Sequence, residues 1–192
     1  MIRPRILAFS GSVRKSSYNS RLLEIAVAGA RQAGAEVTVL DLKEFPLTLF
    51  DEDLEKEEGT PENATRLKAI FLDHNGLLIS APEYNSSITP LLKNTIDWVS
   101  RASVGEAPLA AYRGKVASLM SASPGALGGL RGLVHVRSIL GNIGVTVLPE
   151  QVSVSRASDA FLPDGHLKDE RQQTQVQGLG MGLASVLMRL HA

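Results

Sequence analysis

Short apolar runs of strand length alternate with amphipathic segments of helical spacing along the whole chain. The predicted strands lie at residues 5–9, 36–42, 77–81, 115–120 and 145–148. When strands are joined through helices, the strands run parallel and the helices cover both faces of the sheet. The alternation therefore predicts an α/β fold, a three-layer α/β/α sandwich around a five-stranded parallel sheet. A length of 192 residues suits a single domain over residues 1–192 with a full-sized core.

The predicted helices are bounded by capping residues and by residues that end helices. They begin near Ser20, Pro61, Thr89 and Leu130, and a last helix forms the tail around residues 179–190. Thr60 is expected to cap the second helix, and Gly34 is expected to end the first. The acidic connection at residues 44–62 is predicted to be a solvated loop with an extended piece at 47–50. Because loops of this length are often functional, a lid or an oligomer contact remains an alternative there.

The loop between the first strand and the first helix, residues 10–19, is rich in groups that donate hydrogen bonds. It carries serine hydroxyls, the Arg14 guanidinium and the Asn19 amide, and it leads into the N-terminus of a helix, where anions are favoured. The same residues also fit an ordinary capped loop. No Gly-x-Gly-x-x-Gly follows the first strand and no Gly-x-x-x-x-Gly-Lys-Ser/Thr occurs, which argues against a dinucleotide-type Rossmann site and an NTPase.

The order Gly-Ser-x-Arg-x-x-Ser-x-Asn at residues 11–19 resembles the phosphate loop of the NADPH-dependent FMN reductase family. These are flavodoxin-like proteins that include quinone, azo and chromate reductases. The resemblance implies a flavodoxin-like fold in which this loop surrounds the ribityl phosphate of FMN. The residues implied to bind the cofactor here are Ser10, Ser12, Arg14, Ser17, Tyr18 and Asn19.

A second signature follows the third predicted strand. The turn Pro82-Glu83-Tyr84-Asn85 and the helix at residues 90–101 resemble the turn and helix found after the third strand in the same family. Family members commonly have a glycine at the position of Thr89 or Pro90. The resemblance implies that the turn lies along the flavin ring and ribityl chain. It adds five cofactor-binding residues, Pro82, Glu83, Tyr84, Asn85 and Ser86. From the residues alone, a rigid turn with a packed tyrosine remains the alternative.

Apolar residues recur at helical spacing in residues 90–101, so this helix is expected to have a mostly structural role. Asp97 and Arg101 are spaced for an ion pair. Family resemblance implies that the part of the helix from Lys93 onward helps to form a subunit interface. Trp98, the only tryptophan, is predicted to anchor such an interface.

The loop after the fourth predicted strand, residues 121–132, contains small residues that allow close approach of a ligand. By resemblance it borders the dimethylbenzene edge of the flavin and leaves room for nicotinamide. The residues implied are Ser121, Ser123, Pro124 and Gly125. An ordinary glycine-rich turn is the alternative.

Composition narrows the remaining function classes. Twenty basic residues balance twenty acidic ones, so neither nucleic acid nor an anionic membrane is expected as a partner. Without cysteine there is no disulfide and no thiolate, and the four scattered histidines suit neither a metal site nor a catalytic triad. No signal peptide and no apolar run of membrane length is recognised in the sequence, so a cytoplasmic location is expected.

The resemblance implies an NAD(P)H-dependent FMN reductase. By resemblance, NADPH or NADH supplies a hydride to FMN, and a quinone, azo dye, chromate or free flavin accepts the electrons. No side chain is predicted to act as general acid, base or nucleophile, because the chemistry belongs to the flavin. A homodimer or homotetramer is expected. Two alternatives remain: a flavodoxin-type electron carrier, which the balanced charge disfavours, and a flavin-free binding or regulatory member of the family.

Overall fold

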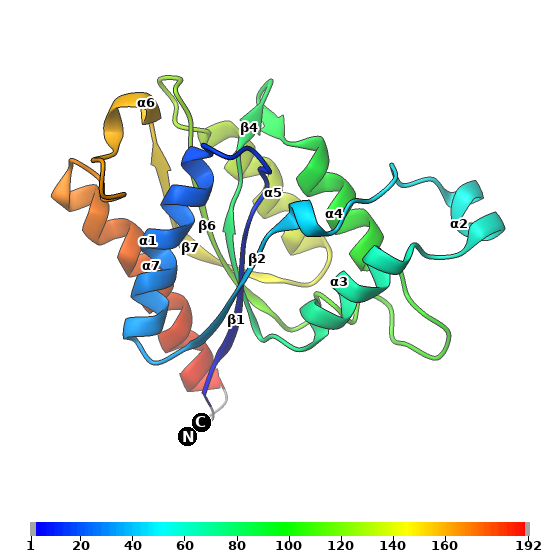
Figure 1. Cartoon of the computed structure of the whole chain (residues 1–192). Coiled ribbons are helices and arrows are strands. Elements are labelled where there is room, and N and C mark those ends of the chain that lie inside the picture. The colour runs from blue at the N-terminus through cyan, green and yellow to red at the C-terminus, as the bar shows by residue number, and fades with distance from the viewer. Residues whose placement is uncertain (1–2, 191–192) are drawn as a thin grey trace.

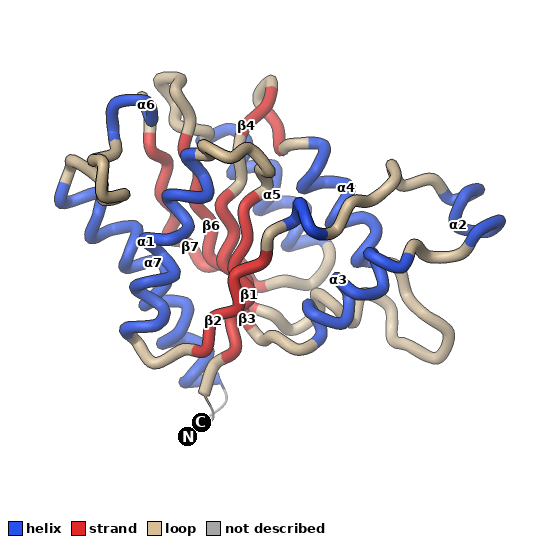
Figure 2. The backbone as a smooth tube through the Cα atoms, in the orientation of Figure 1, coloured by secondary structure: helices blue, strands red, loops and turns tan. Residues whose placement is uncertain are grey.

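Five parallel strands form the central sheet of the computed structural model, which describes residues 3–190. The strand order is β2-β1-β3-β6-β7 (Figure 1, Figure 2). The strands are β1 (Arg5–Ser10), β2 (Glu36–Leu40), β3 (Gly76–Ser80), β6 (Val116–Ala122) and β7 (Thr146–Val154). All neighbouring pairs are parallel, so the predicted five-stranded parallel sheet is confirmed. The carboxyl ends of β1, β3 and β6 therefore lie side by side at one edge of the sheet.

Helices cover both faces of the sheet, which confirms the three-layer sandwich (Figure 1). One face packs against α1 (Tyr18–Gln32) and α7 (Glu170–Leu190), and the other against α3 (Glu62–Leu72), α4 (Pro90–Ser100) and α5 (Leu130–Asn142). Each face has its own apolar core, and β3 is buried along its whole length. No helix within residues 3–190 is long and apolar enough to cross a membrane.

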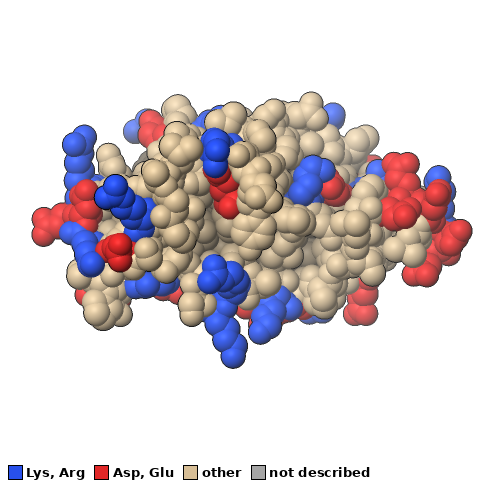
Figure 3. Space-filling view, turned by 90° about the horizontal axis from the view of Figure 1, so that it is seen from above, with Lys and Arg blue, Asp and Glu red and all other residues tan. Residues whose placement is uncertain are grey.

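The acidic connection differs from the predicted loop. β2 ends at Leu40, a short 3-10 turn η1 (Leu42–Glu44) follows, and a helix α2 (Glu52–Glu58) lies inside the expected loop. The Asp51 carboxylate caps α2 by accepting hydrogen bonds from backbone N–H groups, and the acidic first turn suits the positive end of the helix dipole. Because α2 buries no residue, it has no apolar period that the sequence could show. Figure 3 shows acidic side chains gathered at this end of the molecule.

Other boundaries shift by a few residues. Pro61 occupies the N-cap of α3, and no side chain among residues 3–190 caps that helix, so the predicted cap by Thr60 is wrong. β7 begins in the stretch predicted to start the fifth strand and continues to Val154, and a single helical turn, α6 (Ala157–Ala160), follows it. The predicted helix at residues 130–142 is confirmed as α5.

Two predictions about α4 are corrected. Asp97 pairs with Lys93 at 2.8 Å, whereas Arg101 pairs with Glu55 of α2 at 2.8 Å. Arg101 is the C-cap with an extended backbone, so the helical spacing to Asp97 is lost. Trp98 is 1% exposed and its indole N–H donates to the Thr48 carbonyl at 2.8 Å. It therefore anchors the 47–50 segment of its own chain rather than a subunit interface.

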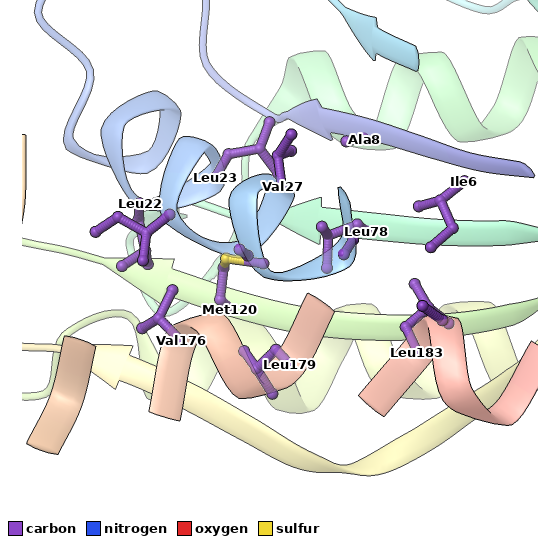
Figure 4. Close-up of a cluster of buried hydrophobic side chains, with 14 of the residues drawn as sticks. Ile6, Ala8, Leu22, Leu23, Val27, Leu78, Met120, Val176, Leu179 and Leu183 are labelled. Atoms are coloured by element: carbon purple, nitrogen blue, oxygen red, sulfur yellow. The ribbon is translucent and has the colours of Figure 1, made fainter. Parts of the chain in front are cut away.

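Glycines bring α1 and α7 unusually close together. A Cβ on Gly180 would lie 1.9 Å from the Ala26 carbonyl oxygen, and one on Gly29 would lie 2.1 Å from that of Gln177. Figure 4 shows apolar side chains of the two helices, among them Leu22 and Leu179, in one cluster over the sheet. Helix α1 is thus held firmly against α7, which fixes the loop that precedes it.

Candidate functional site

The three polar loops predicted from the sequence meet at the carboxyl edge of the sheet. They enclose a small cleft of about 70 Å³, called here the central cleft. Its lining comes from all three loops and consists of Ser12, Arg14, Ser17, Tyr18, Asn19, Pro82, Glu83, Tyr84, Ala122, Ser123 and Pro124. Ala122 is the one lining residue that was not predicted. Five predicted residues do not line the central cleft: Ser10, Asn85, Ser86, Ser121 and Gly125.

Asn19 joins the ends of two strands to the start of α1. Its amide nitrogen donates to the Ala122 carbonyl at 2.8 Å, and its amide oxygen accepts from the Ala122 N–H at 3.0 Å and from the Ser80 hydroxyl at 3.0 Å. The residue is 5% exposed. The side chain therefore ties the start of α1 to the ends of β3 and β6. What Asn19 presents to the cleft is mainly its backbone N–H.

The start of α1 offers several unpaired donors. Ser17 is the N-cap, and its hydroxyl accepts from the Ser20 N–H at 3.3 Å. Among residues 3–190, no partner engages the backbone N–H groups of Tyr18 and Asn19, and no ion pair or hydrogen bond engages the Arg14 guanidinium. Free N–H groups at a helix start, next to an exposed arginine, suit a phosphate. The geometry thus fits the anion that the loop motif implies.

Two hydroxyls near this edge, those of Ser10 and Ser121, are buried and have no hydrogen-bond partner within the described part of the chain. Ser10 ends β1 beneath the loop, and Ser121 lies in β6 beneath Gly129. A Cβ on Gly129, whose φ is +90°, would lie 2.0 Å from the Ser121 hydroxyl oxygen. Ser121 is therefore covered by its own loop. Unsatisfied buried hydroxyls are uncommon in proteins, so the carboxyl edge of the sheet is unusual in carrying two of them.

The second loop forms a small hairpin that presents Tyr84. Strands β4 (Glu83–Tyr84) and β5 (Ser87–Ile88) pair antiparallel through Asn85 and Ser86, whose φ angles are 50° and 70°. Positive φ at both central residues is the signature of a type I′ turn. Tyr84 is 52% exposed, so it is not the packed aromatic of the alternative interpretation. Its ring is available to a flat ligand.

Glu83 is engaged by α5. Its carboxylate accepts from the Arg131 guanidinium at 2.6 Å and from the Gly132 N–H at 3.0 Å. Burial works to raise the pKa of Glu83, but these hydrogen bonds outweigh it and hold that pKa below its ordinary value. The carboxylate therefore stays charged and fixes the hairpin to α5. Arg131 was not predicted because its partner lies 48 residues away in the sequence.

Thr89 links the first two loops. Its hydroxyl donates to the Gly11 carbonyl at 2.8 Å and also caps α4 by accepting from the Leu92 N–H at 3.2 Å. The helix was predicted to begin near Thr89, whereas neither the cap nor the contact with Gly11 was predicted. A Cβ on Gly11 would lie 3.0 Å from the Pro82 ring, which explains why a glycine stands at this crossing.

The family model for NADPH-dependent FMN reductases matches residues 4–159, which contain all three loops. The chain belongs to the NADPH-dependent FMN reductase family. An NAD(P)H-dependent FMN reductase of Pseudomonas aeruginosa is 34% identical over 174 residues, covering 90% of this chain and 89% of that protein. A quinone reductase of Escherichia coli K12 is 34% identical over 139 residues, covering 71% of this chain and 69% of that protein.

Solved structures agree with this assignment. The flavoenzyme FerB of Paracoccus denitrificans, an NAD(P)H:(acceptor) oxidoreductase, superposes with a TM-score of 0.80 at 26% identity over 97% of this chain and 98% of its own. A flavodoxin from an archaeon superposes with a TM-score of 0.63 at 11% identity, over 96% of this chain and 99% of its own, which shows the shared fold alone. The protein is thus a flavodoxin-like oxidoreductase of a family that uses NAD(P)H and FMN. The carrier alternative is not favoured.

Proposed function

We propose that the protein oxidises NADPH through FMN held in the central cleft and passes the electrons to a quinone. One observation carries the placement: the unpaired Arg14 guanidinium stands beside the free N–H groups at the start of α1, at one end of a cleft that Tyr84 borders. The proposed cofactor contacts are the predicted residues that line the central cleft, with the Asn19 side chain in a supporting role. The quinone acceptor is taken from relatives named quinone reductase or quinone oxidoreductase.

The protein residues supply binding and orientation. Arg14 and the backbone N–H groups neutralise and hold the phosphate, and the exposed Tyr84 ring and Pro124 give the flat ring an apolar border. Bound FMN supplies the capacity to accept a hydride and release electrons, which no side chain of the chain provides. The hairpin anchored by Glu83 keeps Tyr84 in a defined position. Positioning is therefore the main contribution of this chain to the rate.

The test is a flavin titration of the purified protein followed by NADPH oxidation with a benzoquinone. Arg14→Ala is expected to weaken FMN binding by about 1.5–3 kcal/mol, the contribution of a charge-assisted contact. Lys56→Ala serves as the matched control, because Lys56 is an exposed cation on α2. Unchanged FMN affinity in Arg14→Ala would place the phosphate elsewhere. A protein that binds no FMN at all would support the flavin-free alternative.

The proposal includes a homo-oligomer and a cytoplasmic location. Leu127, Leu130 and Val134 are 48%, 41% and 60% exposed at helical spacing on and before α5, beside the Tyr84 hairpin. Such an apolar stripe is suited to contact with a second copy. Light scattering on the wild type and on Val134→Glu tests this: the wild type is expected to be a dimer or tetramer, and the variant to dissociate. A monomeric wild type would refute it. The absence of cysteine suits a reducing compartment.

A further inference from the structure

A second and larger cavity lies on the other side of the phosphate loop. It has a volume of about 470 Å³ and runs between α1 and the end of β2, and is called here the α1/β2 groove. It is lined by Ser10, Ser12, Val13, Arg14, Lys15, Ser20, Leu23, Glu24, Val27, Ala28, Arg31, Val39, Leu40, Asp41, Leu42 and Lys43. Ser12 and Arg14 also line the central cleft, so one loop separates the two cavities. This volume suits a small organic ligand.

The wall of the groove is apolar and partly open. Leu23 and Val27 of α1 and Leu40 and Leu42 beyond β2 contribute buried aliphatic surface. Val39 of the edge strand β2 is 53% exposed, which is high for a β-branched residue in a sheet. An exposed aliphatic surface of this kind fits the face of a flat heteroaromatic ring.

The rim of the groove is positively charged, although the whole chain is neutral. Four cations line it, Arg14, Lys15, Arg31 and Lys43, against two carboxylates, Glu24 and Asp41. Within residues 3–190, no ion pair engages any of these four cations. Figure 3 shows basic side chains projecting along the lower edge of the view, away from the acidic end at α2. Unpaired cations around an apolar wall select a ligand that is both aromatic and anionic.

We infer that the α1/β2 groove binds the adenosine 2′-phosphate half of NADPH. The adenine ring lies against the Val39 surface, and Lys43 and Lys15 take the phosphates. Asp41 and Lys43 follow the end of β2 at the rim of the groove, where a carboxylate can accept hydrogen bonds from ribose hydroxyls and an ammonium can bind a 2′-phosphate. This inference rests on the proposed function, because it assigns the donor of that reaction.

The experiment uses FMN-saturated protein, so that the phosphate loop is already filled, and adenosine 2′,5′-bisphosphate as the probe. Calorimetry is expected to show binding that weakens about tenfold in Lys43→Ala, the size expected for loss of one charge-assisted contact. Ala28→Trp fills the groove from an exposed helix position and is expected to abolish probe binding. In both variants the KM for NADPH is expected to rise while kcat and FMN affinity stay unchanged. Lys56→Ala, on α2, is the matched control and is expected to match the wild type.

The outcomes separate this inference from the proposed function. Probe binding that is as tight in Ala28→Trp as in the wild type, with the variant shown to be folded by circular dichroism, would overturn the groove assignment. If Ala28→Trp loses probe binding but the wild-type protein reduces no quinone, the groove assignment is supported and the quinone reductase proposal is refuted. Equal binding of 5′-AMP and the bisphosphate would overturn the assignment of the 2′-phosphate to Lys43 and Lys15.

Discussion

Replacing Asn19 by alanine tests how the candidate site is held together. The substitution removes three hydrogen bonds, two to the Ala122 backbone and one from the Ser80 hydroxyl, all in a buried setting. At about 1 kcal/mol for each bond, with a further cost for the unpaired Ala122 groups, we expect a loss of about 3–4 kcal/mol in the free energy of unfolding. Ser80→Ala removes only one of these bonds and is expected to cost about 1 kcal/mol.

Urea unfolding of the flavin-free protein measures both variants. A domain with the usual stability of about 5–15 kcal/mol remains folded after such a loss, so FMN affinity can be measured on the same samples. If the Asn19 side chain instead served the phosphate directly, Asn19→Ala would weaken FMN binding and leave the stability of the flavin-free protein within about 1 kcal/mol of the wild type. That result would refute the structural role.

Four further substitutions test packing, backbone strain and burial in the fold. Gly180→Ala is expected to destabilise the protein by about 1–3 kcal/mol through its clash with α1, although alanine favours a helix, whereas Gly182→Ala, with open space around it, is expected to stabilise it; urea unfolding compares the two. Ser86→Gly relieves a φ of 70° and is expected to raise stability by about 0.5–1 kcal/mol, visible as a higher melting temperature. Burial lowers the pKa of Lys115 from 10.5 to about 8, so between these values the unfolded chain holds a proton that the folded chain has released. Stability should therefore rise with pH across that window, and Lys115→Met should flatten the rise; an identical slope would contradict the burial argument.

The fold could be predicted because its strands are apolar and its helices amphipathic. β3 is buried along its whole length and reads as a continuous apolar run, and α5 was predicted at its observed bounds. α2 was missed because it buries no residue and therefore has no apolar periodicity. The Asp97–Arg101 pairing was wrong because helical spacing was assumed one residue beyond the end of α4. Local patterns thus indicate elements that face the core, and they fail where an element is solvated or has just ended.

For the candidate site too, some features could be predicted from local sequence and others could not. The sequence placed the three loops at one edge of the sheet, because parallel strands end together, and the residues lining the central cleft come from those loops. It did not show that the Asn19 side chain points inward, that Arg131 holds Glu83, or that Trp98 is buried against residues 47–50. Each of these contacts joins residues far apart in the chain. A motif gives residue types at a loop, whereas the partner of each side chain depends on tertiary packing.

The loop before α1 explains how one short segment can serve two ligands. Its end is anchored by the Asn19 contacts and by the close packing of α1 on α7. Arg14 lines both cavities, whereas Lys43 lines only the α1/β2 groove. Loss of Arg14 should therefore weaken FMN and, in the flavin-free protein, the adenosine probe, whereas loss of Lys43 should weaken the probe alone. This asymmetry follows from the position of one loop between two cavities, and two cavities that shared no residue would not produce it.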